Sequence, residues 1–275
     1  FGGYNPQQLV AVEKQVERGW CPEFVVRKLF IPKNGFWLAA DAKQIEYRLF
    51  AHYANSPDIL EVYRQNPDAD YHQVVKDLLN NPRLNRKLTK NVNFAKIYGA
   101  GLTKFAFMTG YVTEQEYKET INRFEGRPNV NQLLYESAYG EKFRAAFDVN
   151  NAYDAKFPMV KPLLRSAYET AEKRGHVKTL SGRRARLKNR FHSALNRIIQ
   201  GGAADINKRV LIEVYKLRRQ LGLTMRLTVH DELDADLADP AMLPDVEKVL
   251  NTQYYDLRVP ILWDAKLGKN WAEAK

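Results

Sequence analysis

Two carboxylates end short apolar segments that lie far apart in the sequence. Asp41 comes near the end of "FWLAADA", residues 36–42, and Asp231 follows the apolar residues 227–229 of "RLTVHDELDAD". Short apolar runs of this kind are typical of buried strands. If the two strands pair, both carboxylates meet at one edge of a sheet, where mutual repulsion raises a pKa unless a cation joins them. Magnesium prefers such oxygen ligands, so this pair predicts a magnesium site.

Two magnesium ions about 4 Å apart would activate one oxygen and stabilise a second, leaving oxygen. A simpler interpretation is also open, because Asp231 and Glu232 are adjacent and aspartate is common in hairpin turns. This stretch alone does not decide between a metal site and a turn. The same stretch continues with Asp234 and Asp236, which we expect to face solvent.

A predicted helix over residues 83–98 carries a second set of chemical groups. Its end is indicated by Gly99 and Gly101. Each step of four residues turns about 40° round a helix, so four side chains at this spacing lie within an arc of about 120°. Two cations, an aromatic ring and a phenol therefore share one face, at Arg86, Lys90, Phe94 and Tyr98. The cations are suited to bind a triphosphate, with Phe94 beneath a sugar or base; an ordinary basic amphipathic helix is the alternative.

The charge balance indicates a polyanionic partner. Lysine and arginine number 43 against 32 acids, which gives a net charge of +11 and a pI of about 9.5. A soluble basic protein without such a partner is the alternative, but the distribution of charge favours a phosphate-facing patch. Eight basic residues and no acid occur between residues 173 and 190: Lys173, Arg174, Lys178, Arg183, Arg184, Arg186, Lys188 and Arg190.

The bulk composition predicts a soluble protein with a sizeable core. The chain has 275 residues, 45% of them hydrophobic, and no apolar run approaches the roughly 18 residues that a membrane span needs. The first residues do not have the pattern of a secretory leader, so we expect none. The single cysteine, Cys21, excludes an internal disulfide and a cysteine-based zinc site, which fits a reducing compartment.

Local signals outline the remaining elements. Thr113 and Glu116 have the spacing of a capping box, and the helix that they start is broken by "FEGRP" at residues 124–128. Residues 165–174 are predicted to be helical up to Gly175, "HVKTLSGRRARL" to form a hairpin that turns at Ser181-Gly182, and residues 194–219 to form a long helix. Helices dominate the middle of the chain and strands its two ends. We therefore predict an α+β fold whose helical part is inserted between its strands.

Three motifs in order resemble those of a known family. "DAKQIEYR" (41–48), "RKLTKNVNFAKIYG" (86–99) and "VHDE" (229–232) are similar to motifs A, B and C of the family A DNA polymerases. "DADYHQ", "HVKTLSGRRARL", "LNRIIQGGAAD" and "GKNW" resemble further family segments, and "YNPQQL" does so more weakly. The resemblance spans residues 5–271 and includes traits of the phage replicative members.

The resemblance implies a right-hand polymerase fold without a thumb. An antiparallel palm sheet with helices would be formed by residues 1–55 and 182–275, and mainly helical fingers by residues 56–181. An apparent insertion near residues 122–153 is expected to be a surface elaboration, because its charges are mixed. No segment resembles a thumb or a proofreading exonuclease, so we expect these parts to have been trimmed or to belong to a separate polypeptide.

The resemblance also implies roles for the matching residues. Two Mg²⁺ ions, for which Mn²⁺ can substitute, would be held by Asp41, Asp231 and the carbonyl of Ala42. Glu232 would be an auxiliary catalytic carboxylate, and Lys90 would donate a proton to the leaving pyrophosphate. The residues expected to contact the incoming dNTP are Glu46, which blocks a ribose 2′-hydroxyl, His72, Arg86, Lys90, Phe94 and Tyr98. Those expected to contact DNA are Arg48, Asn196, Gln200 and His230 at the primer terminus and minor groove, and Arg183 and Arg184 on the duplex backbone.

The predicted function is template-directed DNA synthesis, in which deoxynucleotides are added to a primer 3′-hydroxyl by two-metal phosphoryl transfer with release of pyrophosphate. The predicted partners are primer–template DNA, dNTPs and the separate polypeptide, and the predicted location is the cytoplasm, on the nucleoid, without a membrane. A single-subunit RNA polymerase-like nucleotidyltransferase is one alternative, and Glu46 argues against it. The others are a non-catalytic DNA-binding polymerase remnant, which would not need Arg86 and Lys90, and a metal-dependent nuclease.

Overall fold

The computed structural model describes residues 26–124 and 127–274. Cys21 and the "YNPQQL" segment, residues 4–9, lie outside these residues. Helices and an antiparallel sheet both occur, in agreement with the predicted α+β class. No helix in the described part of the chain is both long and apolar enough to cross a membrane.

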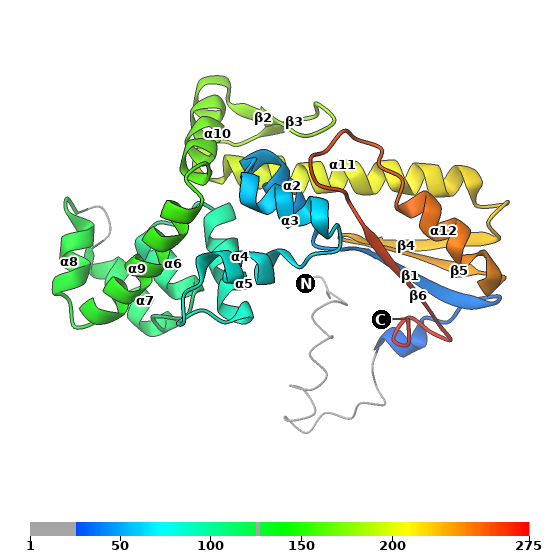
Figure 1. The fold of residues 1–275 in the computed structure, drawn as a ribbon, viewed down its shortest axis with the longest axis horizontal. Helices are drawn as coiled ribbons and strands as arrows, with labels where there is room; N and C mark the ends of the chain where they lie inside the picture. The colour runs from blue at the N-terminus through cyan, green and yellow to red at the C-terminus, as the bar shows by residue number, and fades with distance from the viewer. Residues whose placement is uncertain (1–25, 125–126, 275) are drawn as a thin grey trace. The chain divides into compact units, whose positions relative to one another are not determined.

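One unit of the chain is built on a four-stranded antiparallel sheet (Figure 1). Its strands, in spatial order, are β4 (Leu223–Val229), β5 (Glu232–Leu237), β1 (Phe36–Ala42) and β6 (Trp263–Gly268). The direct pairing of β1 with β4 that the sequence left open does not occur, because β5 lies between them. A hairpin that joins β4 to β5 accounts for the difference: it turns through His230 and Asp231, and β5 returns along β1.

Both faces of the sheet are covered, which explains why β1 is almost continuously apolar. The C-terminal half of α11 (Ala194–Leu217) and α12 (Leu243–Leu250) lie over one face (Figure 1). The other face carries a cluster of Trp37, Ala39, Trp271 and Ala274, with Phe30 packed against it. Two short 3-10 helices, η3 (Val26–Leu29) and η5 (Pro240–Met242), complete this unit.

The acids of β5 do not face solvent, and that expectation for Asp234 and Asp236 is wrong. Glu232, Asp234 and Asp236 are 1%, 0% and 3% exposed. Alternate residues of a strand share a face, so these three side chains form a row beneath the aromatic cluster. Their alternation with Leu233 and Ala235 is the pattern of a strand with one solvent-exposed face, but here the polar face is buried as well.

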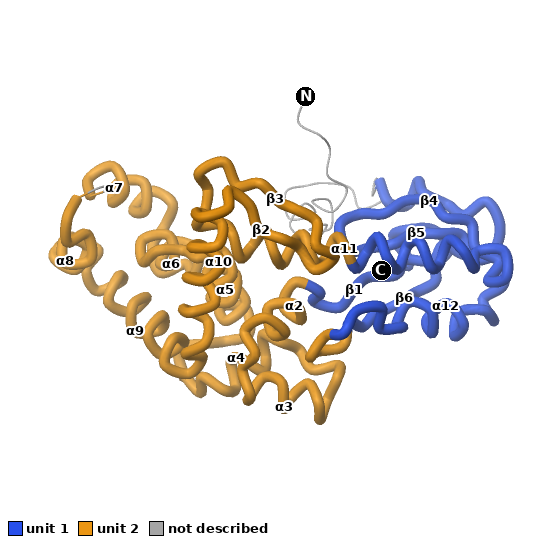
Figure 2. The backbone as a smooth tube through the Cα atoms, turned by 90° about the horizontal axis from the view of Figure 1, so that it is seen from above, with its two compact units in different colours: residues 1–45, 206–256, 261–275 blue, residues 46–205, 257–260 orange. Residues whose placement is uncertain are grey.

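The second unit, residues 46–205 and 257–260, is mainly helical (Figure 2). Its helices are α2 (Ile45–Ala54), α3 (Pro57–Gln65), α4 (Tyr71–Leu79), α5 (Arg86–Ile97), α6 (Leu102–Met108), α7 (Glu114–Phe124), α8 (Val130–Glu136), α9 (Gly140–Lys156), α10 (Val160–Arg174), the 3-10 helix η4 (Phe191–Ser193) and the first half of α11. Helix α5 begins three residues later than predicted, because the side chain of Asn85 caps it by accepting from Leu88 N at 2.8 Å.

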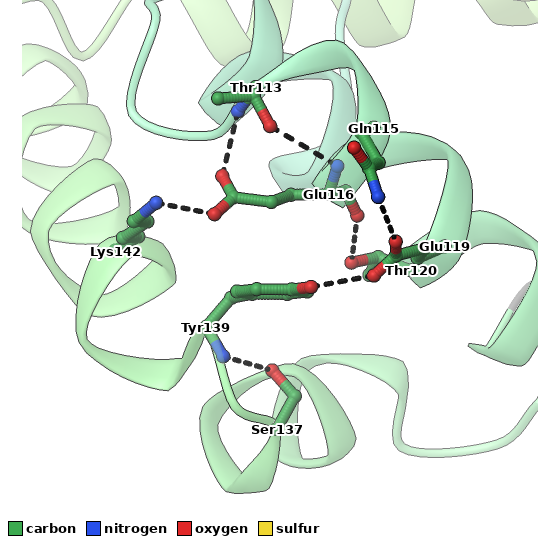
Figure 3. A network of polar contacts seen from close by, with 8 residues as sticks. All are labelled: Thr113, Gln115, Glu116, Glu119, Thr120, Ser137, Tyr139 and Lys142. Atoms are coloured by element: carbon green, nitrogen blue, oxygen red, sulfur yellow. Dashed lines mark hydrogen bonds and ion pairs between the residues drawn. The ribbon is translucent and has the colours of Figure 1, made fainter.

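The capping box predicted at Thr113 is confirmed (Figure 3). Thr113 N donates to the Glu116 carboxylate at 2.8 Å, and Glu116 N donates to Thr113 Oγ1 at 3.3 Å. The same carboxylate pairs with Lys142 of α9 at 2.5 Å, and Tyr139 donates to Glu119 at 2.6 Å. These bonds join α7 to the segment over residues 122–153.

That segment contributes to the core of the unit as well as to its surface. It forms α8 and most of α9, and the side chains of Phe143 and Ala146 are fully buried while Val149 is 1% exposed. The charged residues that α8 and α9 contribute to this segment are exposed, so the segment has a charged outer side as well as a buried one.

The predicted basic hairpin is present as β2 (His176–Lys178) and β3 (Arg184–Arg186). It packs against α11 where Gly201 lies, because a Cβ at this position would come within 2.3 Å of Thr179 Cγ2. The glycine therefore permits the close approach of the hairpin to the helix. Helix α10 stops at Gly175, which has the left-handed φ of +69°, as predicted.

Candidate active site

Asp41 and Asp231 lie at the same edge of the sheet in the first unit. The backbone N–H of Ala42 donates to the carbonyl of Asp231 at 3.0 Å, which joins the end of β1 to the β4–β5 turn. Both aspartates are partly buried. His230, the first residue of the turn, is exposed and has φ +56°, a conformation that is uncommon for residues other than glycine. Its carbonyl accepts from Asn207 Nδ2 at 2.5 Å, which holds the turn to α11.

The chemistry of these donors fits magnesium. Two carboxylates and a backbone carbonyl are hard oxygen ligands, and magnesium is commonly held by one or two carboxylates with water and substrate phosphate completing its shell. Among residues 26–124 and 127–274 there is no group of three or more His, Cys, Asp or Glu side chains arranged to hold a metal by themselves.

Glu232 differs from its neighbour Asp231 in being almost fully buried. It is 1% exposed, it lies opposite Asp41 in the β1–β5 register, and its Oε1 accepts from Trp271 Nε1 at 2.7 Å. The C-terminal "GKNW" segment thus reaches the carboxylate that follows the turn.

The four predicted side chains of α5 lie along one side of this helix. Lys90 Nζ is 5.8 Å from the ring centroid of Phe94, and the rings of Phe94 and Tyr98 stack with centroids 6.2 Å apart. Arg86 is at the first position of the helix, where its Nη2 is 2.6 Å from Asp70 Oδ2, and this ion pair raises the pKa of the guanidinium. Arg86 and Lys90 are exposed, so both cations are accessible to a phosphate.

Aromatic packing supports this side of α5 from within the second unit. Tyr47 of α2 contacts Phe94 edge-on at 5.2 Å and His72 of α4 at 4.3 Å. Glu46, at the start of α2, is partly exposed. Burial and, second, the charge of Glu46 raise the pKa of the Tyr98 phenol. Glu46, Phe94 and Tyr98 thus belong to one neighbourhood of this unit.

His72 is placed as a buried, neutral side chain. It is 2% exposed, and its Nδ1 lies 3.0 Å from Asn93 Nδ2 of α5. Burial is the main cause that lowers the pKa of its imidazole to about 4; the charge of Asp70 opposes this shift, and the cations of Lys90 and Arg86 add to it. The contact with phosphates stays a prediction, while the structure adds a packing role between α4 and α5.

Arg48 is also buried, at 2% exposure, and burial lowers the pKa of its guanidinium. Its Nη1 donates to the carbonyls of Pro67 and Pro260 at 2.8 Å each. The side chain therefore ties the 257–260 segment to the helical unit. Its predicted contact with the primer terminus is not tested by this arrangement.

Asn196 and Gln200 are one helical turn apart near the start of α11, at buried and partly buried positions. The Oδ1 atom of Asn196 is buried and makes no hydrogen bond to the described residues. A buried amide oxygen without a partner is uncommon, so this atom is a candidate acceptor for a bound molecule.

The basic stretch of residues 173–190 is exposed at all eight of its lysines and arginines. Lys178 lies directly opposite Arg184 in the hairpin, an arrangement of like charges that destabilises a strand pair. The guanidinium of Arg183 is more constrained, since Nε and Nη2 donate to Asp205 Oδ1 at 3.2 and 3.1 Å. Arg184 forms no such bond in the described structure and is the more accessible of the two predicted phosphate ligands.

Several residues that anchor the hairpin and the buried acids of β5 were missed in the sequence. Asp205 anchors the hairpin, and Trp37 and Trp271 donate to the buried acids of β5. The motif "GKNW" was the only signal for Trp271, and it carried no indication of the partner. The partners lie up to 197 positions away along the chain, so local spacing could not reveal them.

Several known proteins are similar to this chain. The chain matches the family model described as DNA polymerase family A over residues 15–145 and 136–273. The DNA polymerase DpoZ of Salmonella phage PMBT28 is 30% identical, over 98% of this chain and 42% of its own length. DpoZ of Vibrio phage phiVC8 is 32% identical, over 91% of this chain and 39% of its own length. The thermostable DNA polymerase I of Thermus caldophilus is 28% identical, over 91% of this chain and 28% of its own length.

A solved structure is similar as well. It is titled as the POL domain of Pol1 from M. smegmatis in complex with DNA primer-template and dNTP, with a TM-score of 0.67 and 25% identity over 91% of this chain and 42% of that chain. This chain spans about two fifths of the length of the phage relatives. Because the family model covers most of the sequence, including all three motifs, the chain belongs to DNA polymerase family A.

Proposed function

We propose that this chain carries the nucleotidyl-transfer site of a DNA-directed DNA polymerase. The reaction would add a deoxynucleotide to a primer 3′-hydroxyl, opposite a template base, and release pyrophosphate. One observation carries the proposal: Asp41 and Asp231, about 190 positions apart, meet at one sheet edge through the Ala42–Asp231 hydrogen bond of 3.0 Å. Family membership and a structural relative titled as a complex with primer-template and dNTP support it.

The carboxylates of Asp41 and Asp231, with the carbonyl of Ala42, would hold the two divalent ions. These ions would lower the pKa of the primer hydroxyl and offset negative charge on the pyrophosphate. The protein's own part is to hold the two carboxylates at fixed positions, which the hydrogen bonds of the turn to β1 and α11 support.

The exposed side of α5 would bind the incoming nucleotide. Arg86 and Lys90 are suited to the triphosphate because both are exposed cations on consecutive turns. Lys90 would also donate a proton to the leaving pyrophosphate, and His72 would lie by the same phosphates. Phe94 would contact the sugar and Tyr98 the template base, while Glu46 would exclude a ribose 2′-hydroxyl.

The DNA would be bound by other parts of the chain. Arg183 and Arg184 belong to the exposed basic hairpin and would contact the duplex backbone. Asn196, Gln200, Arg48 and His230 would hold the primer terminus and read the minor groove. In this proposal residues 1–55 and 182–275 form the palm and residues 56–181 the fingers. The chain would act on DNA in the cytoplasm, on the nucleoid.

Primer extension tests the proposal directly. The chain is incubated with a short primed template, Mg²⁺ and either dNTPs or rNTPs, with and without any co-encoded polymerase fragment. The variant Asp231→Ala is compared with Asp256→Ala, which removes an exposed acid from a loop of the same unit. We expect extension with dNTPs by the wild type and by Asp256→Ala, and a loss of at least 100-fold in Asp231→Ala.

The rival functions give different results in the same assay. Extension with rNTPs in preference to dNTPs would favour the RNA polymerase-like alternative. DNA binding without extension under any condition would favour the non-catalytic remnant, and cleavage of the DNA without nucleotide would favour a nuclease.

A further inference from the structure

The buried acids of β5 each receive a specific hydrogen-bond donor. Asp236 accepts from Arg226 Nε at 2.9 Å, pairs a second time with the same guanidinium, and accepts from Lys33 N at 2.9 Å. Asp234 Oδ1 accepts from Trp37 Nε1 at 2.8 Å, and Glu232 Oε1 from Trp271 Nε1 at 2.7 Å. Burial of a carboxylate is costly without such donors, so each of them matters for its acid.

The two tryptophan bonds are alike in chemistry and differ in place. Both are indole N–H donors to a carboxylate that is at most 1% exposed. Glu232 is adjacent to Asp231 and lies opposite Asp41 in the register, whereas Asp234 lies opposite Ala39, two residues further from the edge. Only the bond from Trp271 therefore ends at the edge where the catalytic aspartates meet.

The core holds the indole of Trp271 in one position. Its ring stacks on Trp37 with centroids 6.3 Å apart and meets Phe30 edge-on at 5.3 Å. The guanidinium carbon of Arg27 lies 4.4 Å from its centroid, and its backbone N–H donates to Phe30 O at 3.0 Å. The side chain is 1% exposed, so the N–H vector is set by contacts on several sides.

We propose that Trp271 is a positioning residue for nucleotidyl transfer, which acts by fixing the carboxylate of Glu232 beside Asp231. The C-terminal segment then controls the geometry of the catalytic edge through one N–H group. This inference rests on the proposed function, because Glu232 has its auxiliary role only there. Trp37 and Asp234 form the internal comparison, since the same bond exists where no catalytic role is proposed.

The test compares Trp271→Phe with Trp37→Phe. Each variant removes one indole N–H from a buried carboxylate and keeps an aromatic ring in the same cluster, so we expect similar decreases in Tm. Trp271→Phe is expected to lower kcat for primer extension by about 10- to 100-fold, with KM for dNTP changed less than twofold. Trp37→Phe is expected to leave kcat within twofold of the wild type.

A double-mutant comparison separates positioning from general packing. If Trp271 acts through Glu232, adding Trp271→Phe to Glu232→Gln lowers kcat no further than Glu232→Gln alone. Additive losses, an unchanged kcat in Trp271→Phe, or equal losses in the two tryptophan variants would each overturn the inference. Absence of extension by the wild type would instead overturn the proposed function, and the inference with it.

A second replacement serves if Trp271→Phe does not fold at the assay temperature. Benzothienylalanine incorporated at position 271 keeps the shape of the indole and replaces its N–H by sulfur. The same fall in kcat is expected, and a wild-type kcat in this folded protein would overturn the inference.

Discussion

At the scale of single residues, burial determines the charge of His72. The imidazole packs against Tyr47, contacts Asn93 and has a pKa of about 4, against an ordinary value near 6.5. The folded protein therefore keeps this ring neutral at pH 5, whereas the unfolded chain protonates it. A neutral ring offers a phosphate no full charge, so in the proposed nucleotide site most of the attraction for a triphosphate would come from Arg86 and Lys90.

This difference predicts a pH-dependent stability. Because the unfolded chain binds the proton more tightly, the stability is complete above about pH 6.5 and falls as the pH decreases towards 4. Between pH 7.5 and 5 the free energy of unfolding should decrease by about 2 kcal/mol through this one group. Urea titrations should show a decrease smaller by that amount in His72→Asn. The control His192→Asn replaces an exposed histidine of the same unit, and its free energy of unfolding should depend on pH as that of the wild type does. The same pH dependence in all three proteins would refute a lowered pKa for His72.

At the scale of elements, the buried side of α5 is bonded to α9, which is in turn paired with α10. Lys96, on the buried side of α5, donates to Asp154 and Asn150 of α9 at 2.6 Å each, between the rings of Phe105 and Tyr153. Lys161 of α10 pairs with the second oxygen of Asp154 at 3.1 Å. The helix that presents Arg86 and Lys90 is thus anchored to the segment that includes residues 122–153.

Removing the buried cation of the Lys96–Asp154 pair should lower the free energy of unfolding far more than removing the exposed cation of the Lys161–Asp154 pair. The side chains of Lys96 and Asp154 are 9% and 7% exposed, so Lys96→Met leaves a buried carboxylate short of its main partner and should cost about 3 kcal/mol of unfolding free energy. Lys161→Met removes a cation that is 67% exposed and should cost less than about 1 kcal/mol. The double variant Lys96→Met/Asp154→Leu should recover part of the loss. Equal decreases in the free energy of unfolding for Lys96→Met and Lys161→Met in urea titrations would show that the buried pair is no more stabilising than the exposed one.

At the scale of the whole molecule, the net charge of +11 is concentrated where DNA binding is proposed. One face of the β2–β3 hairpin carries Lys178, Arg184 and Arg186, with Lys178 and Arg184 directly opposed. Such repulsion lowers the stability of the hairpin, and a bound phosphate backbone would relieve it.

The salt dependence of DNA binding should therefore change with Arg184. Each phosphate contact contributes about 0.9 to the slope of log K against log salt, so Arg184→Ala should reduce the slope by roughly 1 and weaken binding to all sequences alike. The matched control is Arg165→Ala on α10, which removes an exposed arginine paired with Glu169 and should leave the slope unchanged. Fluorescence anisotropy at several salt concentrations measures both, and a slope unaffected by Arg184→Ala would exclude a phosphate contact there.

The sequence indicated candidate site residues more readily than the residues that hold them in place. Asp41, Asp231 and the α5 face were found because each has a local signature: an apolar run that ends in an acid, or a spacing of four. The place of β5 between β1 and β4 was missed, because alternating acids at 232, 234 and 236 have the pattern of a solvent-facing strand. Their burial depends on the donors Trp37, Trp271 and Arg226, and the two indoles lie 197 and 39 positions from their acceptors. The hydrogen bond from Arg48 to the carbonyl of Pro260, 212 positions away, likewise had no local signal, and the primer contact that the resemblance implies for Arg48 stays a prediction.

The order of the strands has a consequence for the synthesis of the protein on the ribosome. Both neighbours of β1 come late in the chain, because β5 begins at Glu232 and β6 at Trp263. At 5–20 residues per second, β1 waits roughly 10–40 s for its first neighbour. Throughout that interval the apolar stretch "FWLAA" has neither ladder partner, and unpaired apolar strands are sites of aggregation. Helices α2 to α10 are synthesised before β5, so the edge with Asp41 and Asp231 forms after them, and β1 is exposed to aggregation for a defined interval of synthesis.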